Sequence, residues 1–178
     1  MNLNKYELHQ KPLSRGLLED LKDIFFLTSS KKVFKSNDEK NKFYHRWLGI
    51  YLKYYPEETF YITSDDKLVA YLVACIDTED FINNKADFSH KLGLFKDMYN
   101  HFPCHLHMNC HPDHQRKGLG KILMQALFNE LKRKNVQGVH LLTSPEMDNV
   151  YFYRKQGFDK EQTIVDGKTQ FHFMGKSL

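Results

Sequence analysis

Apolar residues recur at helical spacing in the first third of the chain and predict two helices there. The first helix follows Ser14, a residue type that caps helix N-termini. A Lys-rich polar stretch over residues 29–40 predicts a loop. The second helix is predicted from about residue 39 to residue 54, and Pro56 stops it. The two apolar faces are Leu17, Leu18, Leu21, Ile24 and Phe25, and then Phe43, Trp47, Ile50, Tyr51 and Tyr54.

The pattern changes to that of strands after Pro56. Residues 59–63 and 68–76 predict two strands, and the polar residues 64–67 between them predict the turn of a hairpin. Residues 77–103 are less regular. Within them, helical spacing and a terminating Pro103 predict one further helix, whose apolar positions are Phe88, Leu92, Phe95, Met98 and Phe102.

The second half of the chain alternates strands and helices. Its predicted elements are a strand at 104–110, a helix at 118–134, a strand at 139–143, a helix at 148–156 capped by Gly157, and strands at 163–165 and 169–174. Asp166-Gly167 between the last two strands is a strong hairpin signal. The order predicts an α/β (α+β) single domain with a mixed, mostly antiparallel sheet of six to seven strands flanked by helices.

Composition and charge restrict the ligands, partners and compartment that we expect for this domain. Among 178 residues, 26 Lys and Arg against 22 Asp and Glu leave a net charge of +4, which suits a small anionic ligand. That charge does not predict a nucleic-acid partner, and no stretch reaches the roughly 20 apolar residues of a membrane helix. The N-terminus lacks the apolar core of a signal peptide. We therefore expect a cytoplasmic protein in which Cys75, Cys104 and Cys110 are reduced thiols.

The strongest chemical signal lies between the predicted strand at 104–110 and the helix that follows. Gln115-Arg116-Lys117-Gly118-Leu119-Gly120 places two glycines and several cations at a helix start, where unpaired N–H groups attract anions. Missing side chains at Gly118 and Gly120 let a phosphate approach the backbone. The spacing is neither that of a P-loop nor that of the three-glycine dinucleotide fingerprint. It predicts a pyrophosphate site that serves neither ATP nor NAD.

This segment resembles the GCN5-related N-acetyltransferase (GNAT) superfamily. Residues 115–120 match its acetyl-CoA signature Gln/Arg-x-x-Gly-x-Gly/Ala at every defined position, and Pro112-Asp113-His114 resembles the usual lead-in. A second family element, a helix ending in Tyr-x-x-x-Gly-Phe, is matched by residues 153–158. Within the superfamily, residues 103–109 resemble the acetyltransferase-like domain associated with O-GlcNAcase and its bacterial relatives.

The resemblance implies one acetyltransferase domain over residues 1–178. Its parts would be a helical acceptor-side part at 1–56, a hairpin at 59–76, an acetyl-CoA-binding core at 104–158 and a C-terminal hairpin at 161–174. The family often has an Asn seven residues before its tyrosine, but position 146 is Glu here, and Asn149 is the nearby substitute. The implied acetyl-CoA-binding residues are Met108, Asn109, Cys110, Gln115, Arg116, Lys117, Gly118, Leu119, Gly120, Lys121, Asn149 and Tyr153.

Acetyl transfer also needs an acid and a base. Tyr153 matches the family tyrosine that protonates the departing thiolate. Strand alternation puts Cys104, Leu106, Met108 and Cys110 on a core face, and His105, His107, Asn109 and His111 on the other. His107 is the candidate base, with Asp77 and Glu79 as rivals, and Asn109 is a positioning group. The Cys and His spacing is not that of a zinc finger, so we expect no metal.

The resulting hypothesis is an acetyl-CoA-dependent N-acetyltransferase that moves an acetyl group directly to a primary amine. The acceptor would be a small molecule or a peptide, and the resemblance allows a homodimer. One alternative is a non-catalytic CoA-binding module that keeps the fold without turnover. Another is a nucleic-acid-binding domain that uses Lys31, Lys32, Lys35 and the cluster at 132–134, which salt-sensitive binding would reveal.

Overall fold

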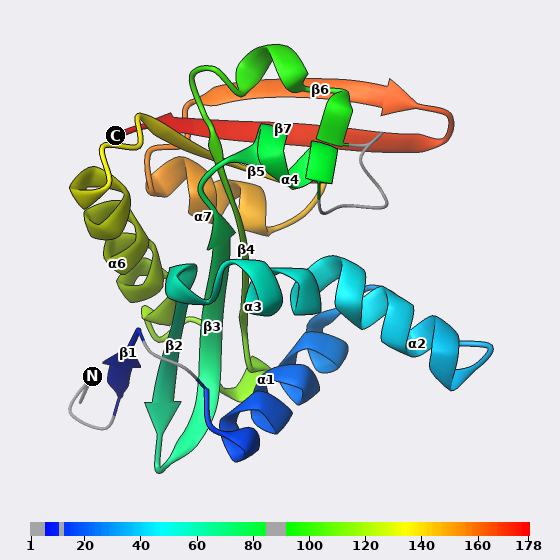
Figure 1. The fold of residues 1–178 in the computed structure, drawn as a ribbon, viewed down its shortest axis with the longest axis vertical. Helices are drawn as coiled ribbons and strands as arrows, with labels where there is room; N and C mark the ends of the chain where they lie inside the picture. Colours follow the sequence, from blue (N-terminus) through cyan, green and yellow to red (C-terminus); the bar gives the residue numbers. More distant parts are fainter. Residues whose placement is uncertain (1–5, 11–12, 85–91) are drawn as a thin grey trace. The chain divides into compact units, whose positions relative to one another are not determined.

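The structure, a computed structural model, describes residues 6–10, 13–84 and 92–178, and within them seven strands form one sheet. The strand order is β1-β2-β3-β4-β5-β7-β6 (Figure 1). β4 and β5 pair in parallel, whereas β1–β2, β2–β3, β5–β7 and β6–β7 are antiparallel. This confirms the predicted mixed, mostly antiparallel sheet. The strands are β1 Glu7–His9, β2 Thr59–Ser64, β3 Lys67–Cys75, β4 Cys104–Cys110, β5 Gly138–Thr143, β6 Lys160–Asp166 and β7 Thr169–Ser177.

Helices flank the sheet, and most of them lie where the sequence predicts a helix. The α-helices are α1 Arg15–Thr28, α2 Asn37–Tyr44, α3 Ile50–Tyr54, α4 Thr78–Asn84, α6 Leu119–Arg133 and α7 Asn149–Lys155. A π-helical turn, η2 His45–Gly49, joins α2 to α3, and the short 3-10 helices are η3 Pro56–Glu58, η4 Lys96–Met98 and η5 Pro112–His114. No helix in the described part of the chain has the length and apolar character that a membrane crossing needs.

The chain divides into two compact units. The first contains Met1–Ala74 and His107–Leu127, and the second contains Cys75–Leu106 and Phe128–Leu178. The boundary passes through β4 and α6 and just before the last residue of β3, Cys75, so each of these elements contributes residues to both units.

In the first unit, local sequence signals set the element ends. Ser14 caps α1 by accepting a hydrogen bond from the Leu17 amide (3.3 Å), as predicted. Ser36 caps α2 in the same way, so this helix begins two residues earlier than the pattern of apolar positions suggests. The β2–β3 hairpin turns at Asp65 and Asp66, both with positive φ.

Two features of the first unit differ from the prediction. The single helix expected over 39–54 is interrupted by the wider π turn of η2. As a result Trp47 and Tyr54 are exposed, while Ile50 and Tyr51 are buried. The short edge strand β1 was not predicted, because three residues with one apolar side chain show no periodicity.

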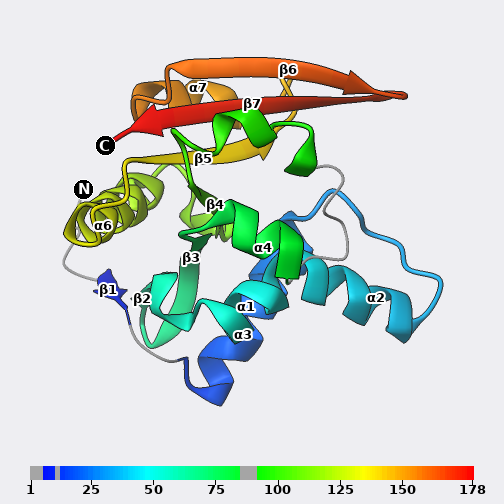
Figure 2. The same ribbon diagram turned by 45° about the horizontal axis from the view of Figure 1, so that its top comes forward.

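In the second unit, β5 and the β6–β7 hairpin lie together, with α7 beside them (Figure 2). The predicted hairpin forms, but its turn lies one residue later than Asp166-Gly167: Asp166 still pairs with Thr169, and Gly167 and Lys168 make the turn. α7 ends at Lys155, and Gly157 follows its C-cap with a φ of +86°, the left-handed conformation that glycine adopts readily at helix C-termini.

The helix expected from Phe88 to Phe102 holds only in part. Phe88 lies outside the described residues, and Leu92 and Gly93 are helical, but the helix does not continue, and residues 96–98 form the short η4. The aromatic residues of this segment pack in a tertiary cluster instead of lining one face of a helix: Phe95, Tyr99 and Phe102 are buried together with Phe173. Spacing alone does not distinguish these two arrangements.

Candidate functional site

The loop between β4 and α6 has the backbone of an anion-binding turn. Arg116 and Gly118 adopt positive φ values of 59° and 81°, and α6 begins at Leu119. A turn of this kind directs successive N–H groups toward one side, and the first turn of a helix leaves its N–H groups without intrahelical acceptors. The buried side chain of Leu119 anchors this start of the helix.

The side chains of the loop leave that backbone accessible. Nothing lies within 4 Å of the position that a Cβ would take at Gly118, and Arg116 and Lys121 are exposed. Lys117 folds back, because its Nζ donates to the Asp113 carbonyl, and Gln115 Nε2 donates to the Cys110 carbonyl (3.2 Å). The contacts of Lys117 and Gln115 brace the loop. The exposed side chains of Arg116 and Lys121 and the accessible backbone remain for an anion.

The predicted division of β4 into a core face and an open face is partly wrong. Cys104 and Leu106 are buried, as expected, but His105 is buried as well. Its Nδ1 lies 2.8 Å from Thr78 Oγ1, and the Phe81 ring packs edge-on against it at 4.7 Å between centroids. The start of α4 therefore covers the face that alternation alone left open.

The later residues of β4 are more accessible. Met108, Asn109 and Cys110 are half-buried, so the last two core-face assignments do not hold fully. Burial raises the pKa of the Cys110 thiol to about 11, and the thiolate that nucleophilic catalysis needs is therefore scarce at neutral pH. The His111 amide donates to the Val69 carbonyl of β3 (2.9 Å), and this bond fixes the end of β4 next to β3.

Three polar side chains meet between β3 and β4 in the first unit. Asn109 Nδ2 donates to Tyr71 Oη at 2.8 Å and lies 3.0 Å from His107 Nε2. Tyr71 Oη lies 3.4 Å from the same nitrogen. Sequence reasoning named His107 and Asn109 but missed Tyr71, which sits within an unbroken apolar run and carries no sequence signal.

Burial controls the charge of this group. It lowers the pKa of His107 to about 4 and raises the pKa of Tyr71 above its usual range. Aromatic rings contribute to that environment, since the Phe25 ring of α1 packs edge-on against His107 at 6.1 Å. His107 and Tyr71 are therefore both neutral at pH 7.

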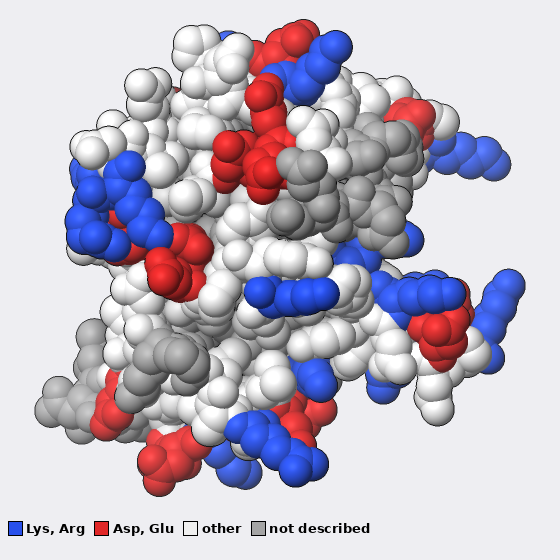
Figure 3. All heavy atoms as spheres, viewed as in Figure 1, with Lys and Arg blue, Asp and Glu red and all other residues white. Residues whose placement is uncertain are grey.

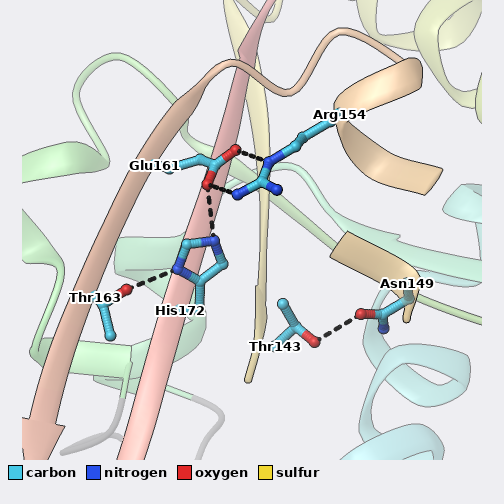
Figure 4. A network of polar contacts seen from close by, with 6 residues as sticks. All are labelled: Thr143, Asn149, Arg154, Glu161, Thr163 and His172. Atoms are coloured by element: carbon cyan, nitrogen blue, oxygen red, sulfur yellow. Dashed lines mark hydrogen bonds and ion pairs between the residues drawn. The ribbon is translucent and has the colours of Figure 1, made fainter. Parts of the chain in front are cut away.

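The second unit carries the other predicted site residues on α7. Tyr153 is buried, with 5% of its surface exposed, and burial raises its pKa above the usual range, so the phenol keeps its proton. Asn149 is exposed at the first position of the helix, where its Oδ1 accepts a hydrogen bond from Thr143 Oγ1 at 3.0 Å (Figure 4).

A polar network holds α7 against the C-terminal hairpin. Arg154 donates two hydrogen bonds to Glu161 of β6, at 2.6 and 2.7 Å. His172 of β7 contacts the same carboxylate at 3.1 Å and Thr163 Oγ1 at 2.8 Å (Figure 4). A bidentate Arg–carboxylate pair restrains orientation as well as distance, so the network fixes the helix that presents Tyr153 and Asn149.

Surface charge near the first two helices is largely paired. Over α2, basic and acidic side chains are interspersed on the face shown in Figure 3. Lys31 pairs with Glu39 at 2.7 Å, and Lys42 pairs with Asp38 at 2.9 Å. Among residues 6–10, 13–84 and 92–178, no group of three His, Cys, Asp or Glu side chains is arranged to hold a metal ion.

Comparisons with known proteins identify the family. The family described as Acetyltransferase (GNAT) domain matches residues 56–160, more than half of the chain. The "Uncharacterized N-acetyltransferase ycf52" of Porphyra purpurea is 39% identical over 57 residues, so the match spans 32% of this chain and about a third of that relative.

Solved structures share the fold over nearly the whole chain. The crystal structure of SsHAT gives a TM-score of 0.73 at 19% identity and covers 97% of this chain and 98% of its own. The NatC complex bound to Gag peptide and CoA gives 0.63 at 13% identity, covering 97% and 99%. With the family match over residues 56–160, the chain belongs to the GNAT acetyltransferase domain family.

Proposed function

We propose that this protein is an acetyl-CoA-dependent N-acetyltransferase that transfers the acetyl group directly to a primary amine. The main observation that supports this function is the loop at 115–120, where positive φ at Arg116 and Gly118 precedes the open first turn of α6. Membership of the GNAT family gives this anion site its meaning, because the family uses acetyl-CoA as donor.

The donor site follows from the properties of the loop. Backbone N–H groups from Arg116 to Gly120 would hold the pyrophosphate, and Arg116 and Lys121 would add positive charge. Backbone groups of Met108, Asn109 and Cys110 would hold the acetyl-pantetheine arm, with Asn149 as a further contact. Acetyl-CoA supplies a thioester carbonyl that an amine can attack. The open space around Gly118 supports this assignment, because a phosphate needs close access to the backbone.

The chemical step needs a base for the amine and an acid for the departing thiolate. The amine nitrogen forms a bond to the thioester carbonyl carbon, the carbon–sulfur bond breaks, and the amine loses a proton. His107 Nε2 would take that proton, because the imidazole is neutral at pH 7. Tyr153 would give its phenol proton to the leaving sulfur, and its high pKa keeps that proton available. Asn109 would orient His107.

The acceptor belongs to the class of small-molecule or peptide amines. The surroundings of His107 include the aromatic rings of Phe25 and Tyr71. Lys22 and Lys40 lie over neighbouring rings, those of Tyr44 and Phe26, at 5.2 and 4.5 Å from the centroids. Ammonium groups of the chain therefore already occupy the faces of these two rings.

Thermal unfolding with acetyl-CoA, CoA and ATP tests the donor assignment. A ligand at 100 times its dissociation constant adds about 2.7 kcal/mol to stability, which raises the melting temperature by a few degrees for a domain of this size. We expect acetyl-CoA and CoA to stabilise the protein and ATP to have no effect. The absence of a shift with acetyl-CoA at millimolar concentration would refute the proposal.

The non-catalytic CoA-binding module is the second candidate, and the Glu at position 146 is the observation that favours it. Release of free thiol from acetyl-CoA in a panel of primary amines separates the two. Acetylation of any amine above the rate of spontaneous hydrolysis, confirmed by the product mass, supports the enzyme. Tight acetyl-CoA binding without release across small amines and peptide N-termini supports the module.

A further inference from the structure

Tyr71 is a buried polar group that the proposed reaction does not use directly. It lies on β3 with no exposed surface, yet its hydroxyl reaches two side chains of β4. Its position makes Tyr71, Asn109 and His107 one network within the first unit, and the hydrogen atoms of that network can be assigned from the chemistry of each group.

The amide of Asn109 decides the assignment. Its Nδ2 carries two hydrogens and no lone pair for acceptance, and these hydrogens point to Tyr71 Oη at 2.8 Å and His107 Nε2 at 3.0 Å. The Tyr71 hydroxyl, having accepted from Asn109, keeps its own hydrogen for the same Nε2 at 3.4 Å. Two donors therefore converge on Nε2, which must be the unprotonated nitrogen.

We infer that Tyr71 and Asn109 are positioning residues that lock His107 in the tautomer protonated on Nδ1, with Nε2 as its basic nitrogen. The reversed amide would place Oδ1 against Nε2 and require the opposite tautomer, so the two arrangements are distinguishable by experiment. The consequence for catalysis rests on the proposed function: the network selects Nε2 as the nitrogen that receives the proton of the amine, and the amine must displace the longer Tyr71 contact (3.4 Å) to reach its single lone pair.

The surroundings keep this imidazole neutral as well as oriented. The titratable side chains that face the network are Tyr71 on β3 and, interacting with it, Tyr44 on α2, and burial raises the pKa of both. Phe25 of α1 adds an apolar edge. Burial lowers the pKa of His107, and the neutral groups around Nε2 bring no negative charge that would favour its protonation.

Nitrogen-15 NMR of the imidazole side chains tests the tautomer directly. We expect the Nδ1–H form for His107 at pH 7. His140 of the second unit is an internal reference, because its Nδ1 lies 2.7 Å from the Phe102 carbonyl, which only accepts. Finding the Nε2–H form of His107 in the wild-type protein would overturn the inference.

Asn109→Asp supplies the decisive variant, because a carboxylate only accepts hydrogen bonds. We expect it to draw the proton of His107 to Nε2 and to raise the pKa of the imidazole, while His140 keeps its tautomer. Asn41→Asp, the same substitution at an exposed position of α2, is the matched control and should leave both histidines unchanged. An unaltered His107 tautomer in Asn109→Asp would also refute the inference.

Turnover gives an independent readout. Asn109→Asp should lower kcat more than tenfold and move the acid limb of the kcat/KM profile to higher pH, with KM for acetyl-CoA nearly unchanged. Tyr71→Phe should lower kcat a few-fold without that pH shift. The NMR result does not depend on acetyl transfer, so a protein that fails to bind acetyl-CoA would refute the proposed function and leave the tautomer inference standing.

Discussion

His107 of β4 and His140 of β5 share a protonation state but differ in what surrounds them. Burial lowers the pKa of each to about 4. His140 has no exposed surface and is stacked between Tyr99 and Phe173, with ring centroids at 4.9 and 4.8 Å. His107 is half-buried, and polar side chains surround its Nε2.

This difference distinguishes a core histidine from a candidate base. Nε2 of His140 has no hydrogen-bond partner among the described residues, and it is enclosed, so no substrate reaches it. His107 is half-buried, as are the residues that follow it on β4, and its Nε2 contacts Asn109 and Tyr71. A lowered pKa is common to both residues, so accessibility and the contacts of each nitrogen distinguish their roles.

The largest effect on stability should come from His140→Ala. This change removes a ring stacked on both faces and leaves a cavity, so we expect the free energy of unfolding to fall by about 3 kcal/mol. Denaturant unfolding measures it, with His107→Ala as the comparison, for which we expect a smaller loss. Equal losses for the two variants would contradict the assignment of His140 to the core and His107 to the site.

Acid should unfold the protein through these same neutral histidines. The unfolded chain binds a proton on each histidine below pH 6.5, whereas folded His140 resists protonation until about pH 4. Stability is thus kept above pH 6.5 and lost as the pH falls from 6.5 to 4, by up to about 3 kcal/mol for His140 at ~1.4 kcal/mol per pKa unit. Urea unfolding at several pH values measures this slope, and His140→Phe should make it shallower.

His107→Gln should lose activity more than stability. Removal of a general base typically costs 10²-fold or more in rate, so we expect kcat to fall about 10²-fold. The melting temperature should change by only a few degrees, since the residue is half-buried. A variant that retains full kcat would exclude His107 as the base and return attention to Asp77 and Glu79.

Two buried tyrosines in the second unit give a further comparison, with a smaller expected effect on kcat. Tyr153→Phe should lower kcat about tenfold by removing the proposed acid, with little change in acetyl-CoA affinity. Tyr99→Phe is the matched variant, because the Tyr99 hydroxyl donates to the Leu92 carbonyl. It should cost about 1 kcal/mol of stability and leave kcat unchanged. Full activity in Tyr153→Phe would remove that residue from the acid role.

Local signals in the sequence predicted much of the fold. Ser14 as a cap and Gly157 after a helix each act within a few residues, and both predictions are confirmed. The C-terminal hairpin is also confirmed, with its turn one residue later than predicted. The helix expected over 88–102 does not continue past Gly93 among the described residues, and Phe95 and Phe102 pack instead with Phe173, a contact between distant segments. Periodicity reports which residues are apolar but not which partners bury them.

The local backbone conformation at the candidate site was predictable from the glycine pattern. The glycine pattern at 115–120 predicted an anion-binding turn, and the left-handed conformation of Gly118 agrees with it. Tyr71 could not be found this way, because its role depends on Asn109 and His107 lying opposite it on the next strand. Burial of His105 likewise depends on Thr78 and Phe81, which lie in a separate segment.

Calorimetric titration with acetyl-CoA tests whether the start of α6 binds the pyrophosphate. The three proteins are the wild type, Gly120→Trp and the control Gly16→Trp. Gly16 is exposed and has open space around its Cβ position. An indole at position 120 would fill the start of α6 where the pyrophosphate is proposed to bind. We expect the wild type and Gly16→Trp to bind with equal affinity and Gly120→Trp to lose binding by more than about 100-fold, or roughly 2.7 kcal/mol. Unchanged affinity in Gly120→Trp, or no binding by the wild type, would contradict the account.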